Sequence, residues 1–457
     1  MRRVQLRIAV DVTAEDLDLI EAWAVEILDQ VGLAVPLPVA LQRLAAFPTV
    51  RIQGDRVHFD GDYILALLHS CRSPRPLQAD SQIRVLAGGG ALSIIDDRTG
   101  ALRTATTDDL LRAFRICDRL GLGGDPPVIP VDIPEPLREV ALYKLAWENT
   151  REFNGRDISS VGVGEYVYQM AQVAAKPFSL SLYIISPLRV NAENLALILH
   201  FADRLASVSV GTMPMPGATA PLLAPGYLAQ ALAEIIGGYA ILSLLMPHAK
   251  VTFGLKLLAF DPYAGGIGCG SPESLLQGQL EVALLRRYDI IPTHYFWSMA
   301  GGCDAQAAAE RMAGVLLGAL AGVRVFGVAG RLQGEAFSLE QLLIDLEIAA
   351  YVERVVRGQA WDDAGQAWLA EVQDAVAEGT YLGSPGTVAH YRAETLHRSL
   401  FDRQNLAQRR GQSQPDLMER VRRQLVALDV PGPEYLSVEA RNELNRIYKH
   451  AEACFGA

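Results

Sequence analysis

The sequence of 457 residues has few cysteines and no excess of positive charge. Its cysteines are scattered and form no C-x-x-C pair, so we expect free thiols in a reducing compartment and no disulfide framework; they are Cys71, Cys117, Cys269, Cys303 and Cys454. Acidic residues outnumber basic ones by 52 to 41, and the net charge of -11 argues against a nucleic-acid-binding surface. Composition therefore excludes a disulfide scaffold and a basic DNA-binding protein.

Long apolar runs are also scarce. The charged N-terminus is not followed by an apolar core of signal-peptide length, and residues 237–247 are apolar but too short to span a bilayer. Residues 313–330 form a longer run, but it contains Arg324 and changes from a small-residue helix pattern to a strand pattern. We interpret this run as a buried helix leading into a buried strand, and we predict a cytoplasmic protein without a membrane span.

Hydrophobic residues make up half of the chain, which is enough for a large core. Residues 1–106 begin with a capping-box pattern at Thr13 and an apolar stripe of helical spacing. Residues 50–58 and 82–103 have the pattern of two hairpins. Because strands and helices do not alternate here, we predict a separate N-terminal α+β cap.

Regular alternation of short apolar strands and helices begins at residue 107 and continues to residue 358. About seven such strands indicate a parallel α/β fold, and the length favours a (β/α)8 TIM barrel over a doubly wound sheet. An eighth strand could lie near residues 92–96. Residues 359–457 are polar and helical in pattern, so we predict a C-terminal helical extension.

In a barrel, the chemistry belongs to the loops that follow the strands. One such loop, residues 212–221, contains three prolines together with Gly217 and Thr219. It could present backbone amides to a ligand or could be a stiff connection without chemistry. A second loop, beginning at Asp261, is rich in glycine but matches no nucleotide-binding pattern, so a tight or mobile loop is favoured there.

Three consecutive aromatic residues, Tyr295, Phe296 and Trp297, follow His294 at the end of a predicted strand. They cannot all face the core of a parallel strand, so at least one should line the mouth, where an aromatic face attracts a quaternary ammonium. Tyr183 and Tyr263, at other strand ends, could add walls to such a cage. Alternatively, these rings only pack the top of the barrel.

A metal site was considered because His294, Cys269 and Cys303 all fall near strand ends. No ligand pair has diagnostic spacing, so we expect no metal, while a thiolate-rich zinc site remains a minor alternative.

Several motifs resemble the trimethylamine methyltransferase superfamily of corrinoid-dependent enzymes. The most specific are residues 216–221 (Pro-Gly-Ala-Thr-Ala-Pro) and 233–238 (Ala-Glu-Ile-Ile-Gly-Gly), which are similar to the family's G-A-T-x-P loop and A-E-x-L-A-G helix. Weaker similarities occur in the same order from the N-terminal helix to Phe401-Asp402-Arg403, so the resemblance covers most of the chain.

This resemblance implies a (β/α)8 barrel that transfers a methyl group from a methylated amine to cob(I)alamin carried by a partner corrinoid protein. The loop at residues 298–303 is about two residues shorter than the family pattern and contains no pyrrolysine, and Gly386-Thr387-Val388 replaces a family H-T-L. A non-pyrrolysine, glycine betaine methyltransferase-like member is therefore implied. A barrel that binds a cationic methylated metabolite without transferring its methyl group is the alternative.

The expected site combines three groups of residues. Tyr183, Tyr263, Tyr295, Phe296 and Trp297 would bind the cation, and Arg331 would pair with a substrate carboxylate. Asp261, His294, Asp304 and Gln306 would supply polar groups to the reaction at the mouth. Gly217 and Thr219 would contact the corrinoid. A homo-oligomer is possible on this interpretation.

Overall fold

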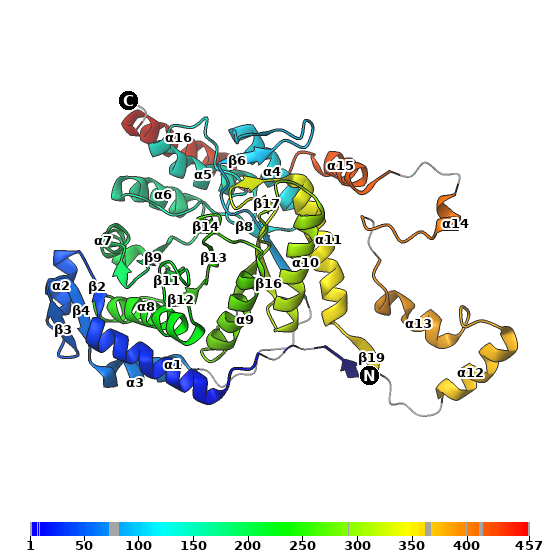
Figure 1. Ribbon diagram of the computed structural model, residues 1–457. Coiled ribbons are helices and arrows are strands. Elements are labelled where there is room, and N and C mark those ends of the chain that lie inside the picture. Colours follow the sequence, from blue (N-terminus) through cyan, green and yellow to red (C-terminus); the bar gives the residue numbers. More distant parts are fainter. Residues whose placement is uncertain are drawn as a thin grey trace.

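The computed structural model describes residues 2–6, 8, 10–72, 82–290, 292–361, 367–397, 400–410 and 415–455. Its centre consists of short parallel strands, and helices surround them (Figure 1). The fold is therefore mixed α/β, as the alternating pattern predicted.

The parallel strands form two hydrogen-bonded arcs. In the first arc, β9 (Ser179–Ile185), β11 (Ser207–Thr212) and β12 (Val251–Leu255) are neighbours in chain order. The second arc has the order β15 (Thr293–Tyr295), β16 (Val325–Ala329), β5 (Arg84–Ala87) and β8 (Gly123–Gly124). Among the strands of these two arcs, the last in the chain, β16, thus pairs with the first, β5.

Helices follow these strands and cover them on the outside (Figure 1). They are α4 (Thr107–Arg119), α5 (Glu135–Asn149), α6 (Val161–Val173), α7 (Ala192–His200), α8 (Ala224–Leu245), α9 (Pro272–Arg286), α10 (Ala305–Leu320) and α11 (Leu339–Val356). Two of these helices begin at serine N-caps: the hydroxyl of Ser271 accepts the Ser274 amide at the start of α9, whose first residue is proline, and the hydroxyl of Ser338 accepts the Gln341 amide at the start of α11.

One strand differs from the sequence-based expectation. Residues 92–96 do not supply the additional strand of the parallel sheet; β6 (Ser93–Ile95) instead forms a hairpin with β7 (Leu102–Thr104) and pairs with β18 (Ala336–Phe337). The parallel position is taken by β5, which lies within the segment expected to be a separate cap. β5 is four residues long and ends at three consecutive glycines with positive φ, so its apolar signal is short.

The N-terminal segment packs against α8. It contains α1 (Ala14–Glu26), the π-helix η1 (Ile27–Val31), α2 (Pro38–Leu44), α3 (Gly61–Cys71) and the strands β2 (Leu33–Ala34), β3 (Val50–Gln53) and β4 (Arg56–Phe59). The capping box at Thr13 and the β3–β4 hairpin confirm their sequence patterns. Through β10 (Arg189–Val190), this small sheet joins the edge of β9.

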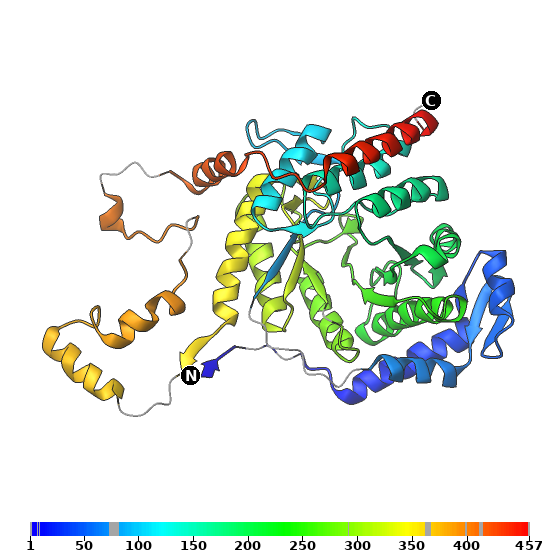
Figure 2. The same ribbon diagram turned by 180° about the vertical axis from the view of Figure 1, so that it is seen from behind.

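The C-terminal part is mostly helical, as predicted. It comprises β19 (Gln359–Trp361), α12 (Ala367–Glu378), α13 (Pro385–Glu394), α14 (Leu406–Arg409), α15 (Leu417–Leu428) and α16 (Val438–Phe455). Figure 2 shows β1 (Arg2–Val4) beside β19, the arm of α12 and α13 projecting from the body, and α16 lying on α5 and α6. No described residue of α13 is buried, and the expectation of a homo-oligomer stays a prediction.

Helix α8 is long and apolar enough to cross a membrane by composition, but 83% of that window is buried inside the protein. It belongs to the larger hydrophobic core, which explains why it is apolar on every side. The run at 313–330 is α10 followed by β16, as predicted.

Candidate active site

A central cavity of about 700 Å³ is lined by residues of β9, β11, β12 and β15, by Ile290 and Pro292 before β15, and by the loops that follow β9 and β11. The strands turn small polar residues or glycine toward it: Ser209, Gly211, Thr252, Gly254 and Thr293. Alternate residues of β9, β11 and β15 are buried on the other side, as the two-residue period of a strand requires. The short side chains at these strand positions leave room for a ligand.

A second, polar cavity of about 260 Å³ adjoins the first, and Tyr183 lines both. Its walls carry Asp125, Arg156 and Asp157, which follow the second arc of strands. The hydroxyl of Tyr183 donates a hydrogen bond of 2.8 Å to Asp157, and the Tyr143 hydroxyl donates to the carbonyl of Arg156 at 2.7 Å. Burial raises the pKa of Asp125; Arg156 and Arg331 oppose that shift, whereas Asp157 adds to it.

Lys256 is the charged residue of the central cavity. Directly after β12, its Nζ lies 3.2 Å from Oε1 of Glu281 and 3.4 Å from the carbonyl oxygen of Thr293. Glu281, on α9, is fully buried and also accepts the Leu257 amide at 3.1 Å. Burial raises the pKa of Glu281, and the neighbouring Lys256 opposes the shift. A buried carboxylate thus fixes the position of the lysine.

The three predicted aromatic residues lie on opposite sides of the chain at β15. Tyr295 lines the central cavity, whereas Trp297 lines a small adjoining hollow of about 40 Å³. Their ring centroids are 4.8 Å apart, and the Lys256 ammonium lies 5.0 Å from the Tyr295 centroid and 5.7 Å from the Trp297 centroid. Burial raises the pKa of Tyr295 to about 12. Phe296 faces the opposite way and packs on Phe326 in the core, so it cannot contact a ligand in the cavity as expected.

His294 also faces away from the cavity. Its ring fits between α9 and α10 because a glycine stands on each helix; a Cβ at Gly318 would lie 2.8 Å from Nδ1, and one at Gly278 would lie 3.1 Å from Cε1. Burial, with a smaller contribution from Lys256, lowers the pKa of His294 to about 3. This histidine is therefore neutral and does not belong to the cavity wall.

Several other expected site residues have local structural roles. Tyr263 is fully exposed in the turn between β13 (Phe260–Asp261) and β14 (Gly266–Ile267), where Asp261 accepts its backbone amide at 2.8 Å. Asp304 is the N-cap of α10, and the Gln306 amide donates to Glu310 at 2.8 Å. Tyr263 and Asp261 thus belong to a surface turn, while Asp304 and Gln306 stabilise the start of α10. None of the four lines either cavity with Tyr183.

The loop after β11 reaches the cavity through Thr219, whose hydroxyl accepts the Met215 amide at 2.9 Å. Gly217 lies in the same loop with a φ of 85°, a conformation that favours glycine. Behind the loop, the buried carboxylate of Glu234 accepts hydrogen bonds from Ser186, Thr212, Leu188 N and Gln230. Glu234 therefore holds the ends of β9 and β11 to α8.

Arg331 is in β17 (Arg331–Leu332), just past the end of β16. Its Nη1 donates to the carbonyl of Gly89 at 2.7 Å, while its buried Nε has no hydrogen-bond partner among the described residues. Burial, followed by Arg156, lowers the pKa of Arg331. Of the two cavities above, neither is lined by Arg331.

Sequence reasoning missed Lys256, Asp125, Arg156 and Asp157. Each of them follows a parallel strand or the parallel bridge at Phe153. A search for charged residues directly after each strand could therefore have found them. The segments before Asp125 and Arg156 are too short and glycine-rich to stand out as strands.

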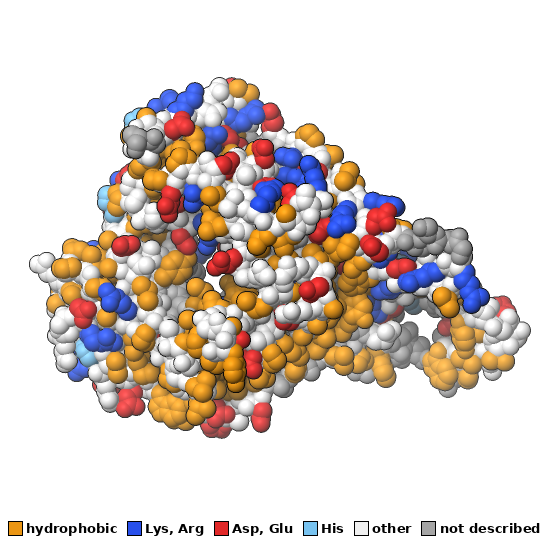
Figure 3. All heavy atoms as spheres, turned by 45° about the horizontal axis from the view of Figure 1, so that its top comes forward, with side chains coloured by type: hydrophobic (Ala, Val, Ile, Leu, Met, Phe, Trp, Pro, Cys, Tyr) orange, Lys and Arg blue, Asp and Glu red, His pale blue; other side chains and the backbone are white. Residues whose placement is uncertain are grey.

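Figure 3 shows the face that carries these strand ends, with a recess near its middle and acidic side chains at the edge. Apolar side chains of the same loops are exposed, among them Met213, Leu222 and Leu223. In the described part of the chain, no group of three His, Cys, Asp or Glu side chains is arranged to hold a metal. Burial raises the pKa of both Cys269 and Cys303 to about 11, which keeps these thiols protonated.

Comparisons with known proteins agree with the motifs. Residues 3–429 match the family model described as trimethylamine methyltransferase (MTTB). The chain is 25% identical over 422 residues, 86% of each protein, to glycine betaine methyltransferase of Desulfitobacterium hafniense (strain Y51). It is 34% identical over 184 residues to trimethylamine methyltransferase MttB of Methanosarcina barkeri, covering 40% of this chain and 37% of that protein.

Among solved structures, the monomethylamine methyltransferase MtmB of Methanosarcina barkeri aligns over 98% of this chain and 96% of its own, with 12% identity and a TM-score of 0.43. The family match covers nearly the whole length, including both cavities and the loops around them. The chain belongs to the trimethylamine methyltransferase (MTTB) family, and it is a methyltransferase.

Proposed function

We propose that this protein transfers a methyl group from a small betaine-like quaternary amine, or a related tertiary amine, to a corrinoid on a partner protein. The observation that carries the proposal is the 700 Å³ cavity with Tyr183, Tyr295 and Lys256 on its walls, in a chain of this family. A cavity of this size holds a small amine and leaves space for a second reactant.

The proposal includes a single (β/α)8 barrel made of the two parallel arcs. Their strands follow in chain order, β16 pairs with β5, and Phe153 forms a parallel bridge to Gly124 between β8 and β9. The mouth of this barrel would be the face where Asp125, Asp157, Tyr183 and Lys256 lie. Active sites of such barrels occupy that face.

A corrinoid bound to the partner would supply the cobalt nucleophile that accepts the methyl group. The proposed fit to such a large group is supported by the recess in Figure 3 and by the exposed apolar side chains of Met213, Leu222 and Leu223 in the segment between β11 and α8. We assign the contact with the corrinoid to the loop of Gly217 and Thr219, whose rigid backbone borders the central cavity.

The chain itself would bind and orient the amine. When a methyl group leaves a quaternary nitrogen, the nitrogen retains the electron pair and the amine departs neutral, so no general acid is required. The ring of Tyr183 would stabilise the cationic nitrogen, and Tyr295, whose ring faces the Lys256 ammonium, would help to exclude water from the methyl carbon. Asp261, His294, Asp304 and Gln306 have structural contacts that account for them, so we assign the substrate contacts to the cavity wall.

The test mixes the purified protein with cob(I)alamin and glycine betaine and follows the cobalamin absorption spectrum. We expect conversion to methylcobalamin that depends on both protein and betaine, and its rate should fall in a Tyr295→Ala, Trp297→Ala double variant. If no betaine is demethylated although calorimetry detects tight binding, the protein is a binder of methylated metabolites and the transfer proposal is wrong.

A further inference from the structure

Tyr295, an aromatic residue of the central cavity wall, is already in contact with a cation. Lys256 places its ammonium over the rings of Tyr295 and Trp297, at 5.0 Å and 5.7 Å from their centroids. These are the distances at which a substrate ammonium would be attracted to the same rings. A second cation approaching this wall would meet a like charge at close range.

Lys256 is held firmly in this place. Its side chain is 12% exposed, and two of its three N–H groups point to Glu281 and to the Thr293 carbonyl. Glu281 has no exposed surface, so the lysine cannot swing away without leaving a buried carboxylate unpaired. The third N–H has no hydrogen bond to another described residue, and Lys256 lines the central cavity, so we assign this N–H to a ligand there.

The adjoining polar cavity carries the complementary charge. Asp125 and Asp157 line this cavity, which shares Tyr183 with the central one. The residues that line the two cavities therefore carry two carboxylates, Asp125 and Asp157, and two cations, Arg156 and Lys256. A ligand with no net charge, positive at one end and negative at the other, matches this wall better than a simple cation does.

We propose that Lys256 is a specificity-determining residue: it binds an anionic group of the substrate and repels methylated ammonium compounds that lack one. This inference rests on the proposed function, and it assigns the substrate class as zwitterions that join a methylated nitrogen to a carboxylate. It also assigns the carboxylate to Lys256 in place of Arg331, which lines neither cavity. Repulsion of the wrong ligand is a common source of such selectivity.

Calorimetry on the full chain tests this with two probes that share a trimethylammonium group, glycine betaine and tetramethylammonium. The wild type should bind glycine betaine and bind tetramethylammonium at least tenfold more weakly. Lys256→Met should weaken glycine betaine binding by roughly 10- to 100-fold, because a charge-assisted hydrogen bond is lost. The same variant should bind tetramethylammonium about tenfold more tightly, since the ring faces become free.

Lys256→Met leaves Glu281 without its partner and could fail to fold, so the double variant Lys256→Met, Glu281→Gln removes both charges. Lys250→Met is the matched control, because Lys250 is exposed at the opposite end of β12 and should leave both affinities unchanged. The proposal is overturned if the double variant loses both probes equally, or if glycine betaine binds it as tightly as it binds the wild type.

This binding pattern does not depend on methyl transfer. A reversal of selectivity without any transfer to cob(I)alamin would support Lys256 and contradict the proposed activity. Transfer from glycine betaine with unchanged selectivity in the variant would do the opposite.

Discussion

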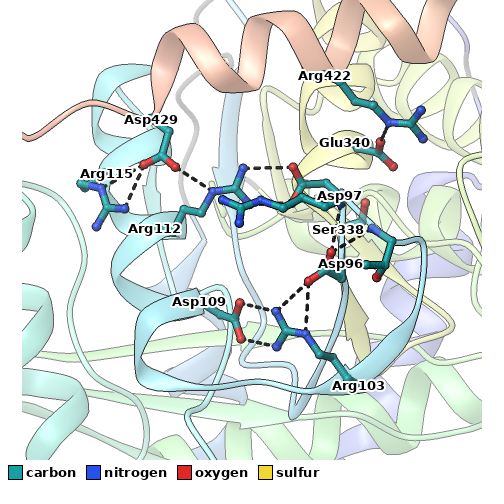
Figure 4. A network of polar contacts seen from close by, with 12 residues as sticks. Asp96, Asp97, Arg103, Asp109, Arg112, Arg115, Ser338, Glu340, Arg422 and Asp429 are labelled. Atoms are coloured by element: carbon teal, nitrogen blue, oxygen red, sulfur yellow. Dashed lines mark hydrogen bonds and ion pairs between the residues drawn. The ribbon is translucent and has the colours of Figure 1, made fainter.

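Charged residues are arranged in two different ways in this protein, in a network beside the mouth and in the mouth itself. In the network, which joins the β6–β7 hairpin to α4 and α15, Arg112 bonds to both Asp97 and Asp429, and Arg103 bonds to both Asp96 and Asp109 (Figure 4). Burial would raise the pKa of Asp96, but hydrogen bonds from Arg103 and from backbone amides outweigh it and lower this pKa to about 2.

The charged residues that line the two cavities have fewer partners. No hydrogen bond or ion pair joins the Asp125 carboxylate to another described side chain. The Lys256 ammonium makes two hydrogen bonds to described residues and has three N–H groups. The same side-chain types therefore stabilise the fold where the chain supplies all their partners, and in our proposal they bind a ligand where it does not.

The largest expected effect comes from breaking the network. Arg112→Met leaves two partly buried carboxylates with fewer partners, and we expect a loss of about 2 kcal/mol in the free energy of unfolding. Glycine betaine affinity should not change. Guanidinium unfolding and calorimetry measure the two quantities.

The control for this variant is Arg446→Met, whose pair with Glu443 is mostly exposed and should matter little. Equal destabilisation by Arg112→Met and Arg446→Met would contradict the idea that the network holds α4 and α15 together.

Features that depend on neighbouring residues could be predicted from the sequence, whereas features that depend on residues far apart in the chain could not. The helix start at Thr13 depends on neighbouring residues, and the sequence predicts it correctly. The role of Lys256 depends on Glu281, 25 residues away along the chain, and on rings of another strand. Its surroundings, Leu255 and Leu257, look like an ordinary buried strand, so no local pattern marks it.

The three consecutive aromatic residues show a second limit of prediction from the sequence. The two-residue period of a strand implies that Tyr295 and Trp297 share one face and Phe296 the other, which the sequence could have indicated. Which face is the cavity is set by the packing of α9 and α10, where Gly278 and Gly318 admit the His294 ring. Tyr263 was misjudged because an extended loop after β12 carries it to the surface.

The next largest effect is expected on the outward face of β15, where His294 should make the free energy of unfolding depend on pH. His294 has a folded-state pKa of about 3, below the ordinary value near 6.5, so its contribution to stability is complete above pH 6.5 and is lost as the pH falls toward 3. At pH 5.5 the free energy of unfolding should be lower by about 1.4 kcal/mol than at pH 7.5 from this group alone.

Guanidinium unfolding of wild type and His294→Gln at these two pH values measures this contribution. The variant should have a correspondingly flatter pH dependence, whereas exposed His69→Gln should retain the wild-type slope. A variant slope equal to that of the wild type would show that His294 is not kept neutral by the core.

The smallest effect is expected in the mouth, where function and stability should separate. Tyr183→Phe removes the hydroxyl that holds Asp157 at 2.8 Å, and we expect glycine betaine affinity to fall about fivefold because the carboxylate loses its fixed position. The free energy of unfolding should change by less than about 1 kcal/mol, since both groups face the polar cavity.

Tyr166→Phe is the control for this last variant, because the Tyr166 hydroxyl bonds to His450 on α16, outside the residues that line the two cavities. If Tyr183→Phe lowered the free energy of unfolding and left glycine betaine affinity unchanged, the Tyr183–Asp157 pair would stabilise the fold, as the network around Arg112 does. An affinity loss with unchanged stability would instead separate the two arrangements of charge, because the polar wall would then be organised for a ligand at the expense of internal pairing.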